Sequence, residues 1–205
     1  DPNLFFDEDG RVYFYWGCAN MTPIWGVEMD PETMQPKTER IELVHGNWSE
    51  NGYEVCGEDH CDLPLEDDAL EAKYRGFMQM QGMDPDNLPP QMQGMAIMLK
   101  GYVSGRPYIE GAWMDKHDSK YYLQYACPGA QFNVYADGVY VSDSPLGPFK
   151  LAQNNPYSYK PGGFIPGAGH GSTMRDQKDN LWHTSTMRIS INHNFERRVG
   201  VWPAG

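Results

Sequence analysis

The fold is decided by three stretches that repeat one layout: DPNLFFDEDGRVYFYWG (residues 1–17), EGAWMDKHDSKYYLQYA (residues 110–126) and HGSTMRDQKDNLWHTST (residues 170–186). Each stretch begins with a polar residue, passes through an Asp-containing turn and continues into an aromatic-rich strand. The register is constant, because an aromatic residue follows twelve positions after each leading residue: Tyr13, Tyr122 and Trp182. The three stretches are therefore copies of one structural unit.

The leading residues of these copies are Asp1, Glu110 and His170. If the fold brings equivalent ends of its repeats together, two carboxyl groups and an imidazole meet at one point, which is a candidate for acid/base chemistry. Each residue alone also has an ordinary structural interpretation. Asp before Pro starts turns, Glu before Gly can end a strand in solvent, and His in GHG can satisfy backbone groups. Their common register favours the functional interpretation.

The rest of the chain reads mostly as β-structure. Short runs rich in β-branched and aromatic residues alternate with turn sequences, and the predicted strands are RVYFYWG, IWGVEM, KYYLQYA, FNVYADGVYVS and NLWHTSTM. Repeats of this length built from four strands predict a β-propeller. Glu110 and His170 are 60 residues apart, but Asp1 and Glu110 are 109 apart. The excess predicts an insert at about residues 56–105, in which LEDDALEAKYRGFMQM has helical spacing.

Composition bounds the class of protein. With 205 residues, 40% hydrophobic and 13% aromatic, the chain is expected to form one globular domain, residues 1–205. Its net charge of −12 argues against nucleic acid and anionic membranes as partners. No apolar run approaches the ~20 residues of a membrane span, and no signal peptide is visible. The chain does not begin with Met, so we expect a piece of something longer.

Cysteines do not fix a cellular compartment. Cys56 and Cys61 bracket GEDH, and His60 between them permits a zinc interpretation, but no second ligand pair stands at a usual spacing. A local disulfide or two free thiols is favoured, and an exported protein would allow the disulfide.

Four segments in order, DPNLFFDEDGRVYFYWG, YIEGAWMDKHDSKYYLQYA, VYVSDSPLGPFK and GHGSTMRDQKDNLWHTST, resemble successive landmarks of family 43 glycoside hydrolases. The resemblance implies a five-bladed β-propeller, here without its opening blade, that cleaves arabinose, xylose and sometimes galactose linkages. It also implies a secreted or periplasmic enzyme acting on an oligosaccharide or polysaccharide.

The same resemblance implies roles for single residues. Asp1 matches the aspartate that tunes the acid's pKa, and Glu110 matches the general acid. His170 resembles the histidine on the propeller axis that helps to hold a hydrated calcium ion, for which sodium is an alternative. Arg197 in FERRVGVW matches a substrate-binding arginine, with Arg198 as a close second candidate.

The aromatic residues Trp16, Trp25, Trp113 and Tyr157 could stack on a sugar ring, although aromatics more often fill the space between sheets. Trp113 is the best candidate, because it lies three residues after Glu110.

Together these observations predict an inverting α-L-arabinofuranosidase or β-xylosidase with no organic cofactor. An exo-galactosidase or galactanase of the same fold, a retaining invertase-like propeller and an inactive carbohydrate-binding propeller are the alternatives. The aspartate that acts as general base in the family has no counterpart here, so we expect the 205 residues alone to be inactive.

Overall fold

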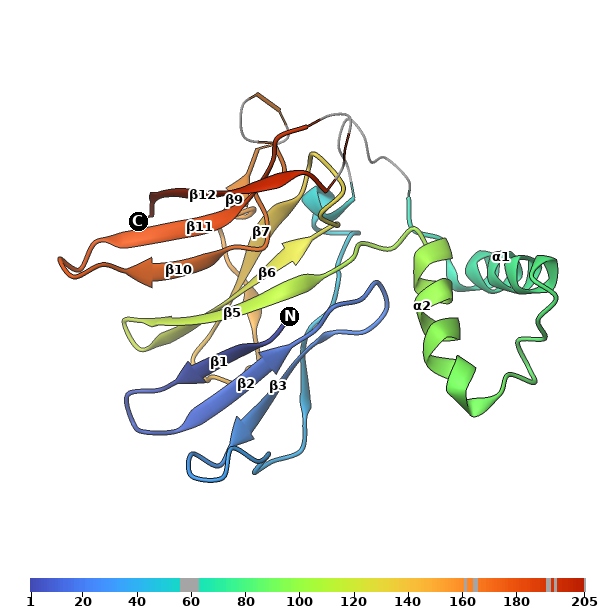
Figure 1. The fold of residues 1–205 in the computed structure, drawn as a ribbon. Coiled ribbons are helices and arrows are strands. Elements are labelled where there is room, and N and C mark those ends of the chain that lie inside the picture. Colours follow the sequence, from blue (N-terminus) through green and yellow to red (C-terminus); the bar gives the residue numbers. More distant parts are fainter. Residues whose placement is uncertain (56–62, 161, 164–165, 191–192, 194, 205) are drawn as a thin grey trace.

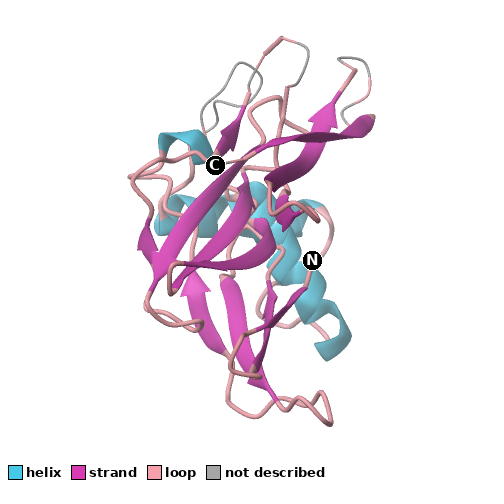
Figure 2. Cartoon of the chain, turned by 90° about the vertical axis from the view of Figure 1, so that its left-hand side faces the viewer, coloured by secondary structure: helices cyan, strands magenta, loops and turns pink. Residues whose placement is uncertain are grey.

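In the computed structural model, the described residues are 1–55, 63–160, 162–163, 166–190, 193 and 195–204. They form three antiparallel sheets and a small helical unit. Figure 2 shows that strands make up the larger part of the fold.

The first sheet has the order β1 (Asn3–Phe6), β2 (Val12–Trp16), β3 (Ile24–Met29) and β4 (Ile41–Val44). Its first hairpin pairs Phe5 with Tyr13, as the Asp-containing turn of the first repeat predicts.

The second sheet follows β5 (Glu110–His117), β6 (Lys120–Cys127), β7 (Ala136–Ser142) and β8 (Lys150–Leu151), and β9 (Ser158–Tyr159) also pairs with β7. The third sheet has β10 (Ser172–Arg175), β11 (Leu181–Arg188) and β12 (Arg197–Pro203). Every strand run quoted from the sequence overlaps one of these strands, to within one residue at its end, so the predicted β-structure is confirmed.

The leading strand of each repeat lies at one edge of its sheet, and these three strands are neighbours. β5 contacts β1 on one side and β10 on the other, so the sheets fan out from a shared line of strands (Figure 1). This is the arrangement of successive propeller blades. The described residues show three such sheets and not a closed ring.

Apolar side chains fill the space between the first and second sheets. Tyr15, Ile24, Leu123 and Tyr125 are fully buried in this core. Burial of aromatic and branched side chains on facing sheets stabilises their packing, at roughly 1.5–3 kcal/mol for each large side chain. The core therefore fixes β1 relative to β5.

The predicted helical insert is present. It contains the helix α1 (Asp67–Met80), a 3₁₀ turn η2 (Pro90–Met92) and the helix α2 (Gln93–Val103), and another 3₁₀ turn, η1 (Gly52–Glu54), lies just before it. The helices stand to one side of the sheets (Figure 1) and share a small core of Leu70, Tyr74, Met78, Ala96 and Val103. Leu65 N donates to Ser104 O at 2.9 Å, which closes the insert at its base. The sequence predicted α1 but not α2.

Candidate active site

Asp1 lies beside Glu110 because β1 is tied to β5. Asp1 precedes β1 by two residues and Glu110 is the first residue of β5. The buried Asn3 accepts a hydrogen bond from Met114 N at 3.0 Å through its Oδ1 atom. This bond fixes the register between the two strands and places the two leading carboxylates at the same end.

A loop between β2 and β3 approaches the same point. Ala19 and Ile109 form an isolated β-bridge, with N to O distances of 3.1 and 3.0 Å. The bridge brings Cys18 next to Glu110. The helical insert supports this loop from outside, because Asn20 donates from Nδ2 to Arg106 O at 2.8 Å, just after α2.

His170 enters from the third sheet, two residues before β10. Its φ of 58° lies in the left-handed region, which a residue other than glycine seldom adopts. Asp137 accepts a hydrogen bond from Gly171 N at 3.1 Å, which holds the backbone after His170. Gly111 also has a positive φ of 64°, and a Cβ there would stand 3.0 Å from the His170 ring. A glycine after Glu110 therefore lets the imidazole approach the acid without a tight contact and without backbone strain.

The two oxygens of Glu110 have different surroundings. Oε1 accepts a hydrogen bond from the hydroxyl of the buried Tyr135 at 2.6 Å. Oε2 faces the other site residues, 3.8 Å from His170 Nδ1 and 3.8 Å from Cys18 Sγ. One oxygen is thus held by the fold and the other is directed into the cluster.

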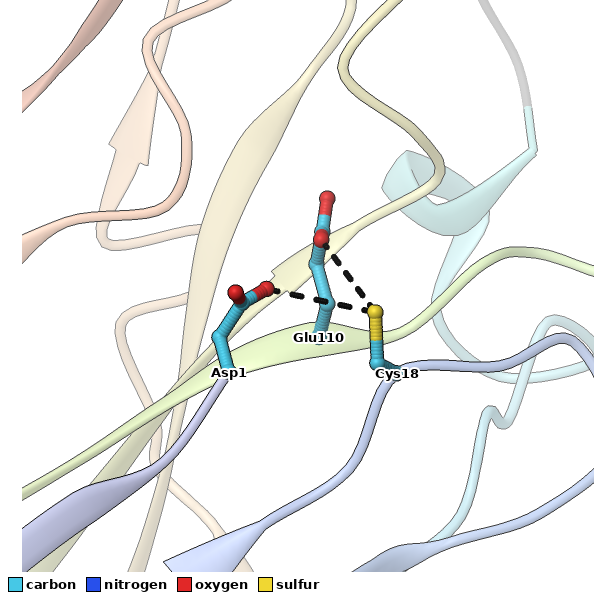
Figure 3. A group of neighbouring side chains, drawn as sticks. All are labelled: Asp1, Cys18 and Glu110. Carbon is cyan, nitrogen blue, oxygen red and sulfur yellow. Dashed lines mark hydrogen bonds between the residues drawn. The ribbon is translucent and has the colours of Figure 1, made fainter.

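Asp1 completes this cluster. Its Oδ2 lies 3.8 Å from His170 Nε2 and 3.9 Å from Cys18 Sγ. Figure 3 shows Asp1, Cys18 and Glu110 converging from three separate segments. The prediction that the three leading residues meet at one point agrees with this placement.

Two tyrosines near the cluster stay neutral. Burial raises the pKa of Tyr135 well above its ordinary value of 10.0, and the negative charge of Glu110 adds to the rise. Burial also raises the pKa of Tyr108, whose hydroxyl is 2.7 Å from Cys18 Sγ. Both phenols therefore remain able to donate hydrogen bonds near neutral pH.

The indole N–H of Trp113 does not bind a residue of the cluster. It donates to Asp115 Oδ2 at 3.1 Å, and Gln124 donates to the same oxygen at 2.9 Å. A β-bulge between Glu110 and Trp113 separates the acid from the tryptophan.

Arg197 and Arg198 differ in their surroundings. Arg197 is half-buried at the start of β12, and its positive charge slightly offsets the rise that burial causes in the pKa of Tyr135. Arg198 is exposed, and its guanidinium lies 3.8 Å from Glu196 Oε1. Arg197 is therefore the less exposed of the two candidate arginines.

Sequence reasoning missed Cys18, Tyr108, Tyr135 and Asp137. Cys18 shares its repeat position with Cys127, each 17 residues after the leading acid, but the spacing does not show that Cys18 reaches the cluster. Tyr108, Tyr135 and Asp137 reach the site through packing between segments far apart in the chain. Tyr135 and Asp137 lie in the segment YADG of a predicted strand, but the sequence does not indicate which residues they contact. Cys56, His60 and Cys61 lie outside the described residues, whereas Cys18 and Cys127 are free thiols.

A hard cation such as calcium prefers six to eight oxygen ligands. Around His170, the described side chains of this cluster offer two carboxylates, one imidazole and one thiol. These donors fit a calcium or sodium ion only if water supplies most of its shell.

The family model for "Glycosyl hydrolases family 43" matches residues 67–202 of this chain. The chain belongs to this family. Comparison with curated proteins finds no match.

Solved structures of similar fold include an endo-1,4-beta-xylanase from Bacteroides thetaiotaomicron, with a TM-score of 0.64, 19% identity, and coverage of 99% of this chain and 53% of that one. A xylan beta-1,4-xylosidase from Bacillus halodurans has a TM-score of 0.60 and 16% identity, over 99% of this chain and 30% of that one. A Bacteroides ovatus protein described as xyloglucan PUL GH43B has a TM-score of 0.63 and 17% identity, over 99% and 30%. The chain thus spans about half or less of the length of these structures.

The fold of this family 43 chain agrees with the predicted propeller blades. The matched span begins at residue 67, so it includes both helices of the insert. Among the described residues, no helix is long and apolar enough to cross a membrane.

Proposed function

We propose that this chain supplies the acid side of the active site of an inverting glycoside hydrolase that releases arabinose or xylose from plant-type polysaccharides or oligosaccharides. The observation that carries the proposal is the placement of Glu110, with Oε1 held by Tyr135 and Oε2 facing Asp1 and His170. Family membership supports the reaction class.

In this mechanism Glu110 Oε2 carries the proton that moves to the glycosidic oxygen as the bond to the sugar carbon breaks. A base takes one proton from a water, and the remaining hydroxide adds to the sugar carbon from the opposite face. Asp1 stands close enough to influence the proton on Glu110, which is the task expected of it. Trp113 and Arg197 are proposed to contact the sugar.

The spacing of the carboxylates argues that Asp1 is not the base. In inverting enzymes acid and base are roughly 6.5–9.5 Å apart, which leaves room for the water. Ligand oxygens of Asp1 and Glu110 lie within 4.8 Å of each other. We therefore infer that a carboxylate other than Asp1 acts as the base. A calcium or sodium ion held near His170 largely through water remains part of the proposal, and no step depends on it.

The test is to replace Glu110 with Gln in the full-length protein. Turnover of natural glycans should fall about 100-fold or more, since general acid catalysis contributes 10² to 10⁴. Aryl glycosides with good leaving groups should lose much less, because their departure needs little protonation. The matched control is Glu39→Gln, an exposed acid outside the site. Equal rates for E110Q and E39Q on both substrate types would remove Glu110 from the mechanism.

Two further measurements separate the alternatives. Proton NMR of the first-formed product gives its anomeric configuration, and a retained configuration would favour the invertase-like mechanism. A panel of arabinofuranosides, xylosides and galactosides identifies the sugar. Binding of oligosaccharides without turnover of any panel member would instead indicate a carbohydrate-binding propeller.

A further inference from the structure

The cluster at the head of the repeats contains a thiol that acid catalysis does not use. Cys18 is exposed, and its Sγ lies 3.9 Å from Asp1 Oδ2 and 3.8 Å from Glu110 Oε2. The potential ligand atoms of Asp1, Cys18 and Glu110 all lie within 4.8 Å of one another. We propose that these three residues bind a thiophilic divalent cation of the zinc class, and that this ion blocks the active site.

The distances suit a small tetrahedral ion. Zinc binds sulfur at about 2.3 Å and carboxylate oxygen at about 2.0–2.2 Å, so a sulfur and an oxygen on one tetrahedral ion are about 3.5 Å apart. The two sulfur–oxygen distances here exceed that value by only a few tenths of an ångström. Binding therefore requires the ligand atoms to move by a few tenths of an ångström.

His170 borders the group formed by Asp1, Cys18 and Glu110 but is not part of it. The His170 ring lies between the two carboxylates, with each nitrogen 3.8 Å from one of them. A water can fill the remaining position of the ion, and a His170 nitrogen could do so only if its ring moves. The thiol in the ligand set favours zinc-class metals over calcium or magnesium, which select oxygen ligands.

Neighbouring groups favour the bound ion. The Tyr108 hydroxyl, 2.7 Å from Sγ, can donate a hydrogen bond to the thiolate. Tyr135 holds Glu110 Oε1, which leaves Oε2 for the metal. Binding releases the thiol proton to solvent, so affinity falls as the pH is lowered.

Inhibition follows from the ligand set, and this part of the inference rests on the proposed function. A metal on Glu110 Oε2 occupies the oxygen that would carry the proton to the leaving group. The ion also fills the space between Asp1 and Glu110. Hydrolysis should therefore be inhibited over the same range of metal concentration in which the ion binds.

The experiment titrates Co²⁺ or Cd²⁺ into the full-length protein and records the thiolate-to-metal charge-transfer absorbance. The starting protein carries Cys56→Ser and Cys61→Ser, so that these thiols cannot contribute. The buried Cys127 is kept in every variant as an internal control. Zn²⁺ affinity is then measured by competition, and Ca²⁺ is tested as a competitor in excess.

We expect one ion per chain and a charge-transfer band that Cys18→Ser abolishes, with at least about a 100-fold loss of affinity. Tyr108→Phe should keep the band and weaken binding by about tenfold, as expected for loss of a supporting hydrogen bond. Excess Ca²⁺ should displace little of the bound ion.

A band of unchanged intensity in the Cys18→Ser variant would overturn the proposal, and so would displacement by Ca²⁺ at concentrations similar to Zn²⁺. The absorbance does not depend on catalysis. If no glycoside is hydrolysed but the band appears and requires Cys18, the metal site stands and the proposed function fails. If glycosides are hydrolysed and no band appears, the proposed function stands and the metal site fails.

Discussion

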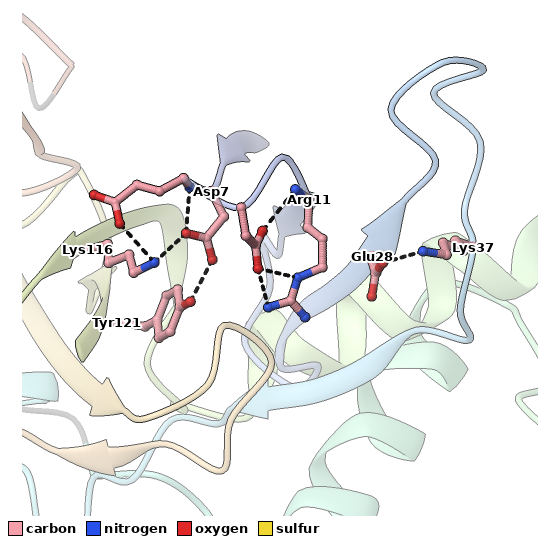
Figure 4. A network of polar contacts seen from close by, with 8 residues as sticks. Asp7, Arg11, Glu28, Lys37, Lys116 and Tyr121 are labelled. Atoms are coloured by element: carbon pink, nitrogen blue, oxygen red, sulfur yellow. Dashed lines mark hydrogen bonds and ion pairs between the residues drawn. The ribbon is translucent and has the colours of Figure 1, made fainter. Parts of the chain in front are cut away.

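The two ends of β1 carry aspartates with opposite characters. Asp7 has a fully buried side chain, and it accepts hydrogen bonds from Lys116 Nζ at 2.5 Å and from Tyr121 OH at 2.6 Å (Figure 4). Asp1 is exposed, and its carboxylate is 3.8 Å or more from His170 and Cys18. Asp7 therefore has short hydrogen bonds to side chains of the second sheet, whereas the contacts of Asp1 with His170 and Cys18 are long.

This difference separates a structural contact from a candidate site. Buried polar groups in a folded protein normally have close partners, and clusters of titratable groups without them are typical of functional sites. We therefore expect substitutions at the Asp7 end of β1 to change stability, and substitutions around Glu110 to change catalysis.

The largest effect should come from Asp7→Ala. Removing one partner of a buried ion pair costs about 3–5 kcal/mol, and because Lys116 remains partly exposed we expect about 2–3 kcal/mol here. Urea unfolding would measure the loss. Asp9→Ala is the matched control, because Asp9 pairs with Arg11 at the exposed surface and its loss should change stability much less. Equal losses for the two variants would contradict the comparison.

The next effect concerns Tyr135→Phe, which removes the hydroxyl that holds Glu110 Oε1. Without this hydrogen bond the Glu110 carboxyl is less well positioned, so kcat/KM for natural glycans should fall by about tenfold, equivalent to about 1.4 kcal/mol. Tyr53→Phe is the control, since it removes a tyrosine hydroxyl that is 2.8 Å from Tyr125 OH instead of Glu110. If the two variants lose the same activity, the hydroxyl of Tyr135 has no specific effect on the acid.

A smaller effect is expected for Arg197→Ala. If the half-buried Arg197 binds the sugar, KM should rise about fivefold, the loss of roughly one hydrogen bond. Arg198→Ala tests the second candidate, and we expect little change in KM because its guanidinium points to Glu196. A larger rise for Arg198→Ala would reverse the assignment.

The sequence predicted the convergence of Asp1, Glu110 and His170, because residues at the same position in each repeat occupy equivalent places in the repeated units. It predicted α1 from its apolar spacing. It did not predict α2, whose sequence QGMAIMLKGYV includes two glycines and follows a proline-rich stretch.

The contacts of Tyr135 and Cys18 could not be predicted either. Tyr135 reaches Glu110 from 25 positions away and Cys18 reaches it from 92 positions away. Such contacts depend on how sheets and loops pack, and no spacing in the sequence records them. Trp113 was proposed from its closeness to Glu110 in sequence, and its sugar contact stays a prediction, since the hydrogen bond from its indole N–H to Asp115 concerns the edge of the ring and not the face that would stack on a sugar.

The smallest expected effect is the pH dependence of stability that Asp7 contributes. Burial acts to raise the pKa of Asp7, but hydrogen bonds from Lys116 and Tyr121 outweigh it, so the pKa lies below its ordinary value of 3.8. Between pH 6 and pH 4 the unfolded chain begins to bind a proton at this residue while the folded chain does not. Stability should therefore fall with pH by roughly a few tenths of a kcal/mol from this residue, and further as the pH falls through the folded pKa.

Asp7→Asn isolates this contribution, because the variant has no carboxyl at position 7 while every other acid still titrates. The measurement compares the free energy of unfolding of the two proteins in urea at pH 6, 4 and 3. The wild-type protein should lose more stability than the variant over this range, and the gap should widen below pH 4. A variant that loses as much stability as the wild type would show that Asp7 is not held ionised by Lys116 and Tyr121, and the contrast between the two ends of β1 would then lack its electrostatic basis.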